Sequence, residues 1–262
     1  MTLRPPHLTQ ARADRFKDQS VVDAYPLRWP YPPETFQVLV DLLVDSPGIA
    51  LDVGTGTGNI ARPLVARVGR VDAVDVSAPM LARARALPGG DRPGLRWIES
   101  RVEDFATESR YSLITAGESL HWMDWDIALP RFRELLVPGG MLAILQRSEG
   151  PIPWQDGLAG LIATHSTVRN YEPFDLIGEL EDRSLFDVKG RHKTTPVPFR
   201  QSVADYIESF HSRSSLSRET MPPGAADAFD TGLRAIAEPW SEDGVVVLQT
   251  MGDMVWGEPL AG

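Results

Sequence analysis

The sequence predicts an α/β fold in which the strands of a mostly parallel sheet alternate with helices. Short apolar runs bounded by turn residues, typical of buried strands, are separated by segments whose apolar residues recur at helical spacing. This alternation indicates βαβ units. Right-handed crossovers then place ligand sites at the carboxyl ends of the strands.

The expected strands are apolar stretches of roughly five or six residues, followed by two longer segments late in the chain. They cover 49–53, 71–76, 95–99, 111–116 and 141–145, with a sixth strand over 186–197 and a seventh over 244–255. We therefore expect a seven-stranded sheet.

The expected helices lie between these strands. Residues 33–44 place Phe36, Leu39, Val40 and Leu43 on one face. Others are expected over 59–68, over 78–87 with Ser77 as N-cap, and over 126–136 after a cap-like Asp124. Helical segments over 154–168, 203–216 and 225–237, and a helix followed by a Pro-rich stretch over 14–32, lie outside the minimal sheet, and we expect them to form a cap.

Composition excludes several functional classes. The chain has 262 residues, 36 of them acidic and 26 basic, and its formal charge of −10 disfavours nucleic acid as the main partner. It has no cysteine, which excludes a disulfide scaffold, thiolate metal sites and a cysteine nucleophile. No apolar run reaches the ~18 residues of a membrane span, and the start has no apolar signal region. We expect a soluble cytoplasmic protein, monomeric or homodimeric.

The most informative segment is the glycine turn Asp52–Gly58, with the spacing D-x-G-x-G-x-G. It follows an expected strand and opens an expected helix, where glycine permits a tight turn and close approach of a ligand. The dinucleotide fingerprint needs a glycine at position 59, which is Asn, and no phosphate-binding P-loop motif is present. Asp52 disfavours a pyrophosphate and suits a ligand that carries a cation. The alternative is an ordinary strand–helix turn.

A second acidic residue, Asp75, ends the second expected strand, 23 positions after Asp52. A carboxylate at this place can accept hydrogen bonds from both ribose hydroxyls. The alternative role is a helix cap, but Ser77 already supplies one. The position therefore favours a nucleoside-containing ligand.

Four motifs, taken in their order along the chain, resemble those of a known enzyme family. LDVGTGTG, VDAVDVSAPML, WIESRVEDF and LITAGESLHWMDWDIALPRFRELLVPGGMLAI resemble the motifs of class I S-adenosylmethionine-dependent methyltransferases over residues 14–145. The H-W-x-D sequence, residues 25–32 and residues 255–259 are similar to a subgroup of small-molecule methyltransferases that includes trans-aconitate methyltransferase-like proteins. The resemblance implies a Rossmann-like three-layer sandwich, S-adenosylmethionine as cofactor, and O-, N- or C-methylation of a small molecule.

The resemblance also implies cofactor-binding roles. The turn would line the amino-acid tail and ribose, Asp75 would hold the ribose diol, and Val76, Met80, Val102 and Glu103 would surround the adenine. Backbone carbonyls of Ala116 and Gly117 would face the cofactor amine. The full set of expected cofactor-binding residues is Asp52, Gly54, Thr55, Gly56, Gly58, Asp75, Val76, Met80, Val102, Glu103, Ala116 and Gly117.

His121 is the candidate catalytic residue, as a general base or an orienting group just beyond the fourth strand. The alternative is a structural histidine that fastens its loop. Candidate substrate residues are Glu118, Trp122, Tyr25 and Tyr31. The tyrosines would close over the cofactor as a lid, or belong to an arm that merely covers the sheet. Large apolar side chains such as Trp122 are more often core than pocket residues.

We expect no metal. His121, Asp124 and Asp126 could suggest a metal site, but aspartates beside a helix start are more often caps.

We expect a single domain over 1–262, with cap elements 1–35, 150–180 and 200–240. Three alternatives to methyl transfer remain open. One is an enzyme that binds the cofactor but catalyses another reaction, such as a cyclisation in natural-product synthesis, and a second is a non-catalytic regulatory protein that binds the cofactor. The third, an NAD-dependent oxidoreductase, is opposed by the glycine spacing.

Overall fold

The computed structural model describes residues 8–45, 47–169 and 171–260, which form two compact units. The sheet unit comprises the described parts of 31–148, 174–195 and 251–262, and the helical unit those of 1–30, 149–173 and 196–250. The expected cap segments overlap the helical unit. Residues 31–35 and 174–180 of those segments lie instead in the sheet unit.

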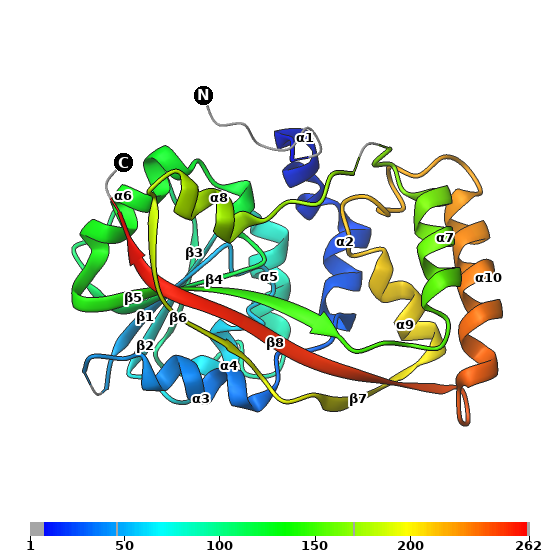
Figure 1. The fold of residues 1–262 in the computed structure, drawn as a ribbon, viewed down its shortest axis with the longest axis horizontal. Helices are drawn as coiled ribbons and strands as arrows, with labels where there is room; N and C mark the ends of the chain where they lie inside the picture. The colour runs from blue at the N-terminus through cyan, green and yellow to red at the C-terminus, as the bar shows by residue number, and fades with distance from the viewer. Residues whose placement is uncertain (1–7, 46, 170, 261–262) are drawn as a thin grey trace. The chain divides into compact units, whose positions relative to one another are not determined.

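The strands follow the order β3-β2-β1-β4-β5-β8-β6, with β7 paired to β8 outside this path (Figure 1). The pairs from β3 to β5 are parallel, whereas β8 is antiparallel to β6 and β7. The α/β class and the mostly parallel sheet are confirmed. The strands are β1 Ile49–Val53, β2 Arg70–Asp75, β3 Leu95–Glu99, β4 Tyr111–Gly117, β5 Leu136–Glu149, β6 Phe186–Lys193, β7 Val197–Ser202 and β8 Val245–Pro259.

Three strand predictions need correction. The sheet of the described residues has eight strands, not the expected seven. The single strand expected over 186–197 ends at Lys193, and a separate strand begins at Val197. Pro196, which carries no backbone N–H donor, lies between them. The strand expected over 141–145 is the central part of a much longer β5.

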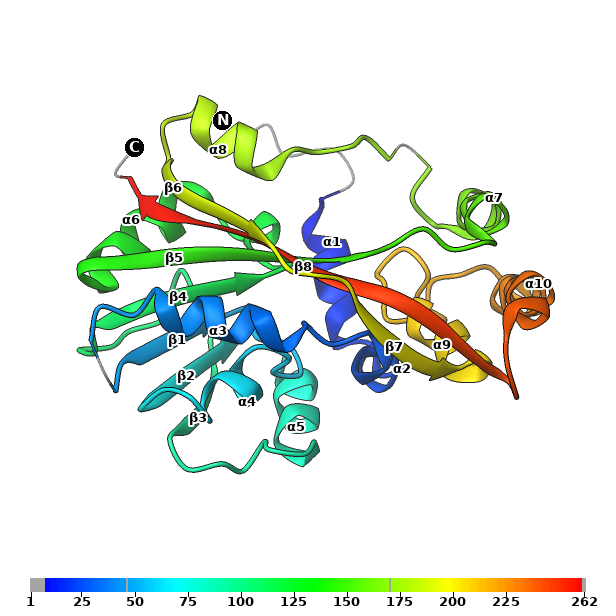
Figure 2. The same ribbon diagram turned by 60° about the horizontal axis from the view of Figure 1, so that its bottom comes forward.

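Helices cover both faces of the sheet within the sheet unit (Figure 2). Helices α3 and α4 lie on one face and α6 and α8 on the other, while α5 packs beside β2 and β3. The bounds are α3 Pro33–Asp41, α4 Ala61–Leu64, α5 Ala78–Ala86, the 3₁₀ turn η3 Leu120–Trp122, α6 Trp125–Leu135 and α8 Leu176–Asp182. The three-layer sandwich is therefore confirmed.

The predicted caps are present. Ser77 Oγ accepts a hydrogen bond from the Met80 amide at 3.3 Å, and Asp124 Oδ1 accepts one from the Asp126 amide at 3.2 Å. Such caps satisfy amide donors that the first helical turn leaves unbonded. The helix expected over 59–68 is only the single turn α4, and the sequence reading did not predict α8.

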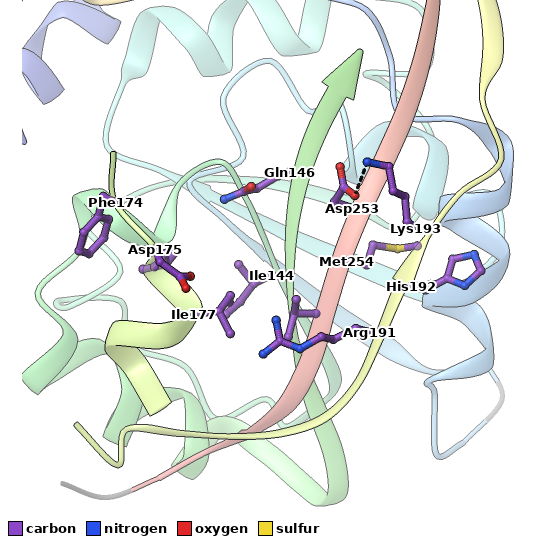
Figure 3. Close-up of a pocket in the computed structure, with 12 residues that line it drawn as sticks. Ile144, Gln146, Phe174, Asp175, Ile177, Arg191, His192, Lys193, Asp253 and Met254 are labelled. Atoms are coloured by element: carbon purple, nitrogen blue, oxygen red, sulfur yellow. Dashed lines mark ion pairs between the residues drawn. The ribbon is translucent and has the colours of Figure 1, made fainter. Parts of the chain in front are cut away.

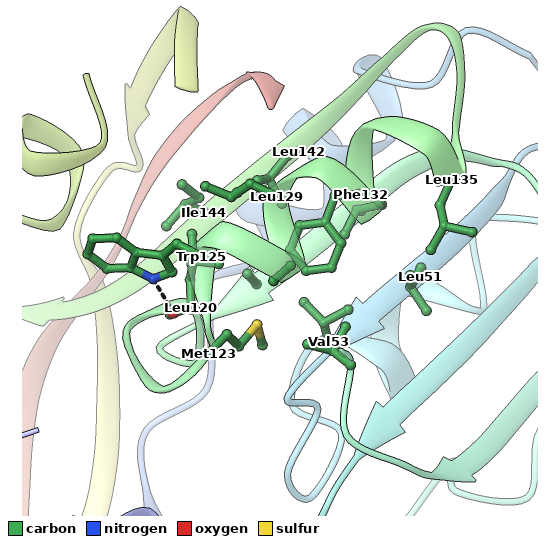
Figure 4. Close-up of a cluster of buried hydrophobic side chains, with 14 of the residues drawn as sticks. Leu51, Val53, Leu120, Met123, Trp125, Leu129, Phe132, Leu135, Leu142 and Ile144 are labelled. Atoms are coloured by element: carbon green, nitrogen blue, oxygen red, sulfur yellow. Dashed lines mark hydrogen bonds between the residues drawn. The ribbon is translucent and has the colours of Figure 1, made fainter. Parts of the chain in front are cut away.

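One core lies between the sheet and α6 (Figure 4). Leu51 and Val53 of β1 pack there with Phe132 and the fully buried Trp125 of α6, whose indole Nε1 donates to the Leu120 carbonyl at 2.9 Å. This packing fixes the loop that connects β4 to α6.

The opposite face has its own core, formed by Phe36 and Leu39 of α3 and Leu64 of α4 against β1, β2 and β4. Tyr31 is 4% exposed and belongs to this core. The apolar face expected for residues 33–44 is thus confirmed, although the helix ends at Asp41.

The helical unit has a separate core. It is built on four buried aromatic residues, Trp154, Tyr206, Phe210 and Phe229. The rings of Tyr206 and Phe210 are in edge-to-face contact, with their centroids 5.2 Å apart. The expected helices over 154–168, 203–216 and 225–237 are present with tighter limits. The elements are α1 Gln10–Ala13, η1 Asp14–Lys17, α2 Gln19–Ala24, η2 Tyr25–Leu27, α7 Gln155–His165, α9 Val203–Phe210, α10 Ala225–Ala237 and η4 Glu238–Trp240, with β7 and the first part of β8.

The N-terminal stretch is more broken than expected, because two short α-helices alternate with two 3₁₀ turns before Pro30. Pro26 lies within the second of these turns. Across the described ranges, none of the helices has both the length and the apolar character needed to cross a bilayer.

A substitution at Gly58 tests the local packing. Its φ is +77°, and an added Cβ would lie 2.4 Å from Cη2 of Trp97. Gly58→Ala should lower the free energy of unfolding by roughly 2–4 kcal/mol, because a left-handed backbone and an overpacked contact both cost free energy. Urea unfolding measures this.

Gly139→Ala is the matched control, since Gly139 has φ +80° but its Cβ would meet only Val44, at 3.4 Å. Its free energy of unfolding should fall by only about 1–2 kcal/mol, the cost of the left-handed backbone. Equal losses in the two variants would show that the Trp97 contact is unimportant.

Candidate active site

The glycine turn connects β1 to α4, and its three glycines adopt left-handed backbone angles. The φ values are +62° at Gly54, +55° at Gly56 and +77° at Gly58. An added Cβ at Gly54 would lie 2.4 Å from Cβ of Ser119. The Thr55 amide donates to the Val74 carbonyl at 3.1 Å, which ties the turn to β2. Glycine is required here both for backbone angle and for space.

Asp52 is buried, 1% exposed, at the start of the turn. Its Oδ1 accepts a hydrogen bond from Thr115 Oγ1 at 2.7 Å, and its Oδ2 accepts one from Thr55 Oγ1. Burial raises the pKa of Asp52 to about 6, although the two hydroxyls and the Ala61 amide oppose the shift. The carboxylate thus joins β1, β4 and the turn at a single point.

Asp75 ends β2 and faces the same turn. Its Oδ2 accepts from the Gly56 amide at 2.7 Å, and its Oδ1 accepts from the Ser77 amide at 2.8 Å. Burial raises the pKa of this carboxyl, and the backbone hydrogen bonds act against that rise. The structure therefore places the two predicted carboxylates at the carboxyl ends of the neighbouring strands β1 and β2.

The end of β4 packs against the turn from the other side. Ser119 Oγ donates to the Val53 carbonyl at 2.7 Å. An added Cβ at Gly117 would lie 2.4 Å from Ile60 Cδ1 and 3.0 Å from the Tyr31 hydroxyl. Ala116 is fully buried. A side chain at Gly117 would therefore require Ile60 to shift.

His121 lies in η3, immediately after these residues, and is half-buried. Its ring centroid is 4.9 Å from that of Trp122, at an interplanar angle of 50°. Leu120 and Trp125, on either side of this pair, belong to the core. The loop that carries His121 is therefore anchored at both ends.

The residues expected near an adenine differ in exposure. Val76 is 48% exposed, whereas Met80 and Val102 are buried. Glu103 Oε1 accepts from the Asp124 amide at 2.8 Å, so it fastens the start of α6. Their proposed contacts with a ligand remain predictions.

Glu118 makes an ion pair that sequence reasoning did not foresee. Its carboxylate is bound by the guanidinium of Arg147 on β5, and that guanidinium carbon lies 5.4 Å from the centre of the Tyr31 ring. The feature that brings the two residues together is the parallel pairing of β4 with β5. It places Gly117 beside Leu145 and so brings Glu118 next to the end of β5.

One predicted residue is in the other unit. Tyr25 belongs to the helical unit, where it contacts Phe16 edge-on at 6.2 Å and lies under the Arg28 guanidinium at 4.3 Å. Its role as a lid remains a prediction. The other predicted site residues lie in the sheet unit.

A cavity of about 470 Å³ lies elsewhere on the sheet unit (Figure 3). It is bordered by β5, β6, β8 and the start of α8, with Lys193 and Asp253 paired at 3.3 Å on its wall. None of the predicted site residues lines it. Within the described ranges, no group of three or more His, Cys, Asp or Glu side chains is arranged to hold a metal ion.

Comparison with known proteins gives a domain match over part of the chain. Residues 50–140, which hold the glycine turn, Asp75 and His121, match the model of a methyltransferase domain. Trans-aconitate 2-methyltransferase of Acidovorax sp. (strain JS42) is 25% identical over 70% of this chain and 75% of its own length. Methyltransferase ptaI of Pestalotiopsis fici is 35% identical over 46% of this chain, a match that spans only 40% of that protein.

A solved structure from Anaeromyxobacter dehalogenans, provisionally described as a type II methyltransferase, has the same fold. It aligns with a TM-score of 0.65 and 22% identity, and covers 90% of this chain and 99% of its own. The domain match and the sequence relatives support a class I S-adenosylmethionine-dependent methyltransferase, and the solved structure shows the same fold.

Proposed function

We propose that this chain binds S-adenosylmethionine at the carboxyl ends of β1, β2 and β4 and methylates a small-molecule acceptor there. The observation that carries the proposal is the pair of carboxylates, Asp52 and Asp75, on either side of a left-handed glycine turn. Both carboxylates lie within the matched methyltransferase domain.

The residues present fit this cofactor. Gly54 and Gly58 leave no room for a side chain, which suits backbone that approaches a ligand closely. Asp75 would accept the ribose hydroxyls, and Asp52 would order the turn and offset positive charge. Thr55 and Gly56 would line the tail and ribose, and the carbonyls of Ala116 and Gly117 would receive the amine. Val76, Met80, Val102 and Glu103 would enclose the adenine.

The cofactor, when bound, supplies an activated methyl group on a positively charged sulfur. The task of the protein is then to hold the acceptor's nucleophilic atom in line and to exclude water. His121 would take a proton from the acceptor or would orient the acceptor. Trp122, Glu118 and Tyr31 would form the acceptor's wall.

We propose that the helical unit acts as a cap of the same single domain, with Tyr25 contributing to a lid. The setting is a cytoplasmic monomer or homodimer. The net charge of −10 supports an acceptor other than nucleic acid.

Removal of the Asp75 carboxylate should weaken cofactor binding. Asp75→Ala should lower the affinity for S-adenosylhomocysteine by on the order of 1–3 kcal/mol, because hydrogen bonds to a charged acceptor are lost. Isothermal titration calorimetry measures this. Glu99→Gln is the control, since Glu99 is an exposed acid paired in register with Asp75 on the adjacent strand. Unchanged affinity in a folded Asp75→Ala protein would contradict the assignment.

Asp52 should make stability depend on pH. Its pKa rises from 3.8 when unfolded to about 6 when folded, so the folded state loses stability as pH increases from about 4 to about 6. Asp52→Asn removes this loss. The difference in free energy of unfolding, Asp52→Asn minus wild type, should therefore be about 2 kcal/mol larger at pH 7.5 than at pH 4.5, which means that the variant gains relative stability at the higher pH. Urea unfolding of both proteins without ligand tests this, and a pH-independent difference would contradict it.

His121 should affect the chemical step more than cofactor binding. If it is the general base, His121→Ala should lower the rate of methyl transfer by about 100-fold or more, with nearly unchanged affinity for S-adenosylhomocysteine. His121→Gln separates the roles, because glutamine can orient an acceptor but cannot take its proton. Wild-type turnover in His121→Ala would remove the residue from the site.

A further inference from the structure

The two side chains of the Glu118–Arg147 ion pair differ in their exposure to solvent. The Arg147 side chain is 4% exposed and that of Glu118 is 26% exposed. The guanidinium therefore lies behind the carboxylate, and the carboxylate is the side of the pair that a ligand can reach.

The backbone holds Glu118 in place at some conformational cost. Its φ is +53°, in the left-handed region that few residues other than glycine adopt. Its amide donates to the Leu145 carbonyl at 2.9 Å, and its Oε1 accepts from the Arg147 amide at 3.4 Å. Such a conformation persists only where the surroundings fix it, and it is most common at functional sites.

The neighbours of Glu118 belong to the proposed cofactor site. Gly117 precedes it, and Ser119, which follows it, donates to Val53 and packs against Gly54 of the turn. The carboxylate thus belongs to the short segment after β4 that packs against the glycine turn.

We infer that Glu118 selects acceptors whose reacting group donates a hydrogen bond, such as an amine or a hydroxyl, and that Arg147 is its positioning residue. This inference rests on the proposed function. A fixed carboxylate accepts strong hydrogen bonds from N–H and O–H groups, and it repels another carboxylate. Arg147 holds the Glu118 carboxylate in one orientation, and its own guanidinium stays charged when buried.

The opposite interpretation is that Arg147 itself binds an acidic acceptor. Its guanidinium is buried, already bound to Glu118, and beside the Tyr31 ring. An acid would have to displace Glu118 to reach it. The structure therefore favours the exposed carboxylate as the recognition group.

The test uses two ligands that need no knowledge of the acceptor. S-adenosylhomocysteine is neutral at sulfur, whereas sinefungin carries an amine in place of the sulfonium methyl group, directed toward the acceptor. Calorimetry should show that Glu118→Gln weakens sinefungin binding about 10-fold and changes S-adenosylhomocysteine binding less than 2-fold. Arg147→Met should show the same selective loss, and Arg147→Lys a smaller one.

Glu181→Gln is the matched control, because Glu181 pairs with Arg191 at 3.0 Å on α8 and β6, outside the proposed site. It should leave the ratio of the two affinities unchanged. If Glu118→Gln does not fold, the comparison of Arg147→Lys with the wild type decides the same ratio.

Equal weakening of both ligands, or no weakening of either, in Glu118→Gln would overturn the inference while leaving cofactor binding intact as a conclusion. Wild-type protein that binds neither ligand would overturn the proposed function and the inference with it. Isotope-labelled methyl transfer to carboxylic acids, abolished in Arg147→Met and retained in Glu118→Gln, would also overturn the inference.

Discussion

The buried carboxylate of Asp52 is the constraint on which the site depends. It is removed from water, yet it receives hydrogen bonds from Thr55 in the turn and from Thr115 on β4. An unsatisfied carboxylate at this depth would be strongly unfavourable, so the turn and β4 must stay where they can donate. The same contacts that solvate Asp52 therefore hold the turn in position between the two strands.

Asp75 extends this arrangement to β2. Because it accepts from the Gly56 amide, the turn is held from both sides by carboxylates, and the left-handed glycines allow the backbone to reach both. Negative charge is thereby concentrated where parallel strands end, which is the usual ligand position in open α/β sheets. A ligand that carries a cation and hydroxyls is complementary to such a site.

Much of this could be predicted from the sequence, because the strong signals are local. The apolar runs that became β1 to β4, the caps Ser77 and Asp124, and the glycine spacing depend on a few adjacent residues. The short helix α8 was not predicted, since seven residues rich in Glu and Asp give little periodic signal. The break between β6 and β7 was missed because alternation continues across it.

The site was less predictable where its geometry depends on register. Arg147 lies just beyond the apolar run that suggested β5, and nothing nearby marks it as a partner of Glu118, 29 positions earlier. Only the pairing of Gly117 with Leu145 brings them together. Tyr31 likewise joins the core beneath the sheet, a position decided by packing with α3 that a Pro-rich sequence does not reveal.

The most direct test of the account is a calorimetric titration of the wild-type protein with S-adenosylhomocysteine and, separately, with NAD. Both ligands contain an adenosine, but only NAD brings a pyrophosphate to the acidic turn. The account predicts low-micromolar or tighter binding of S-adenosylhomocysteine and no measurable binding of NAD. Tight binding of NAD without binding of S-adenosylhomocysteine would contradict it.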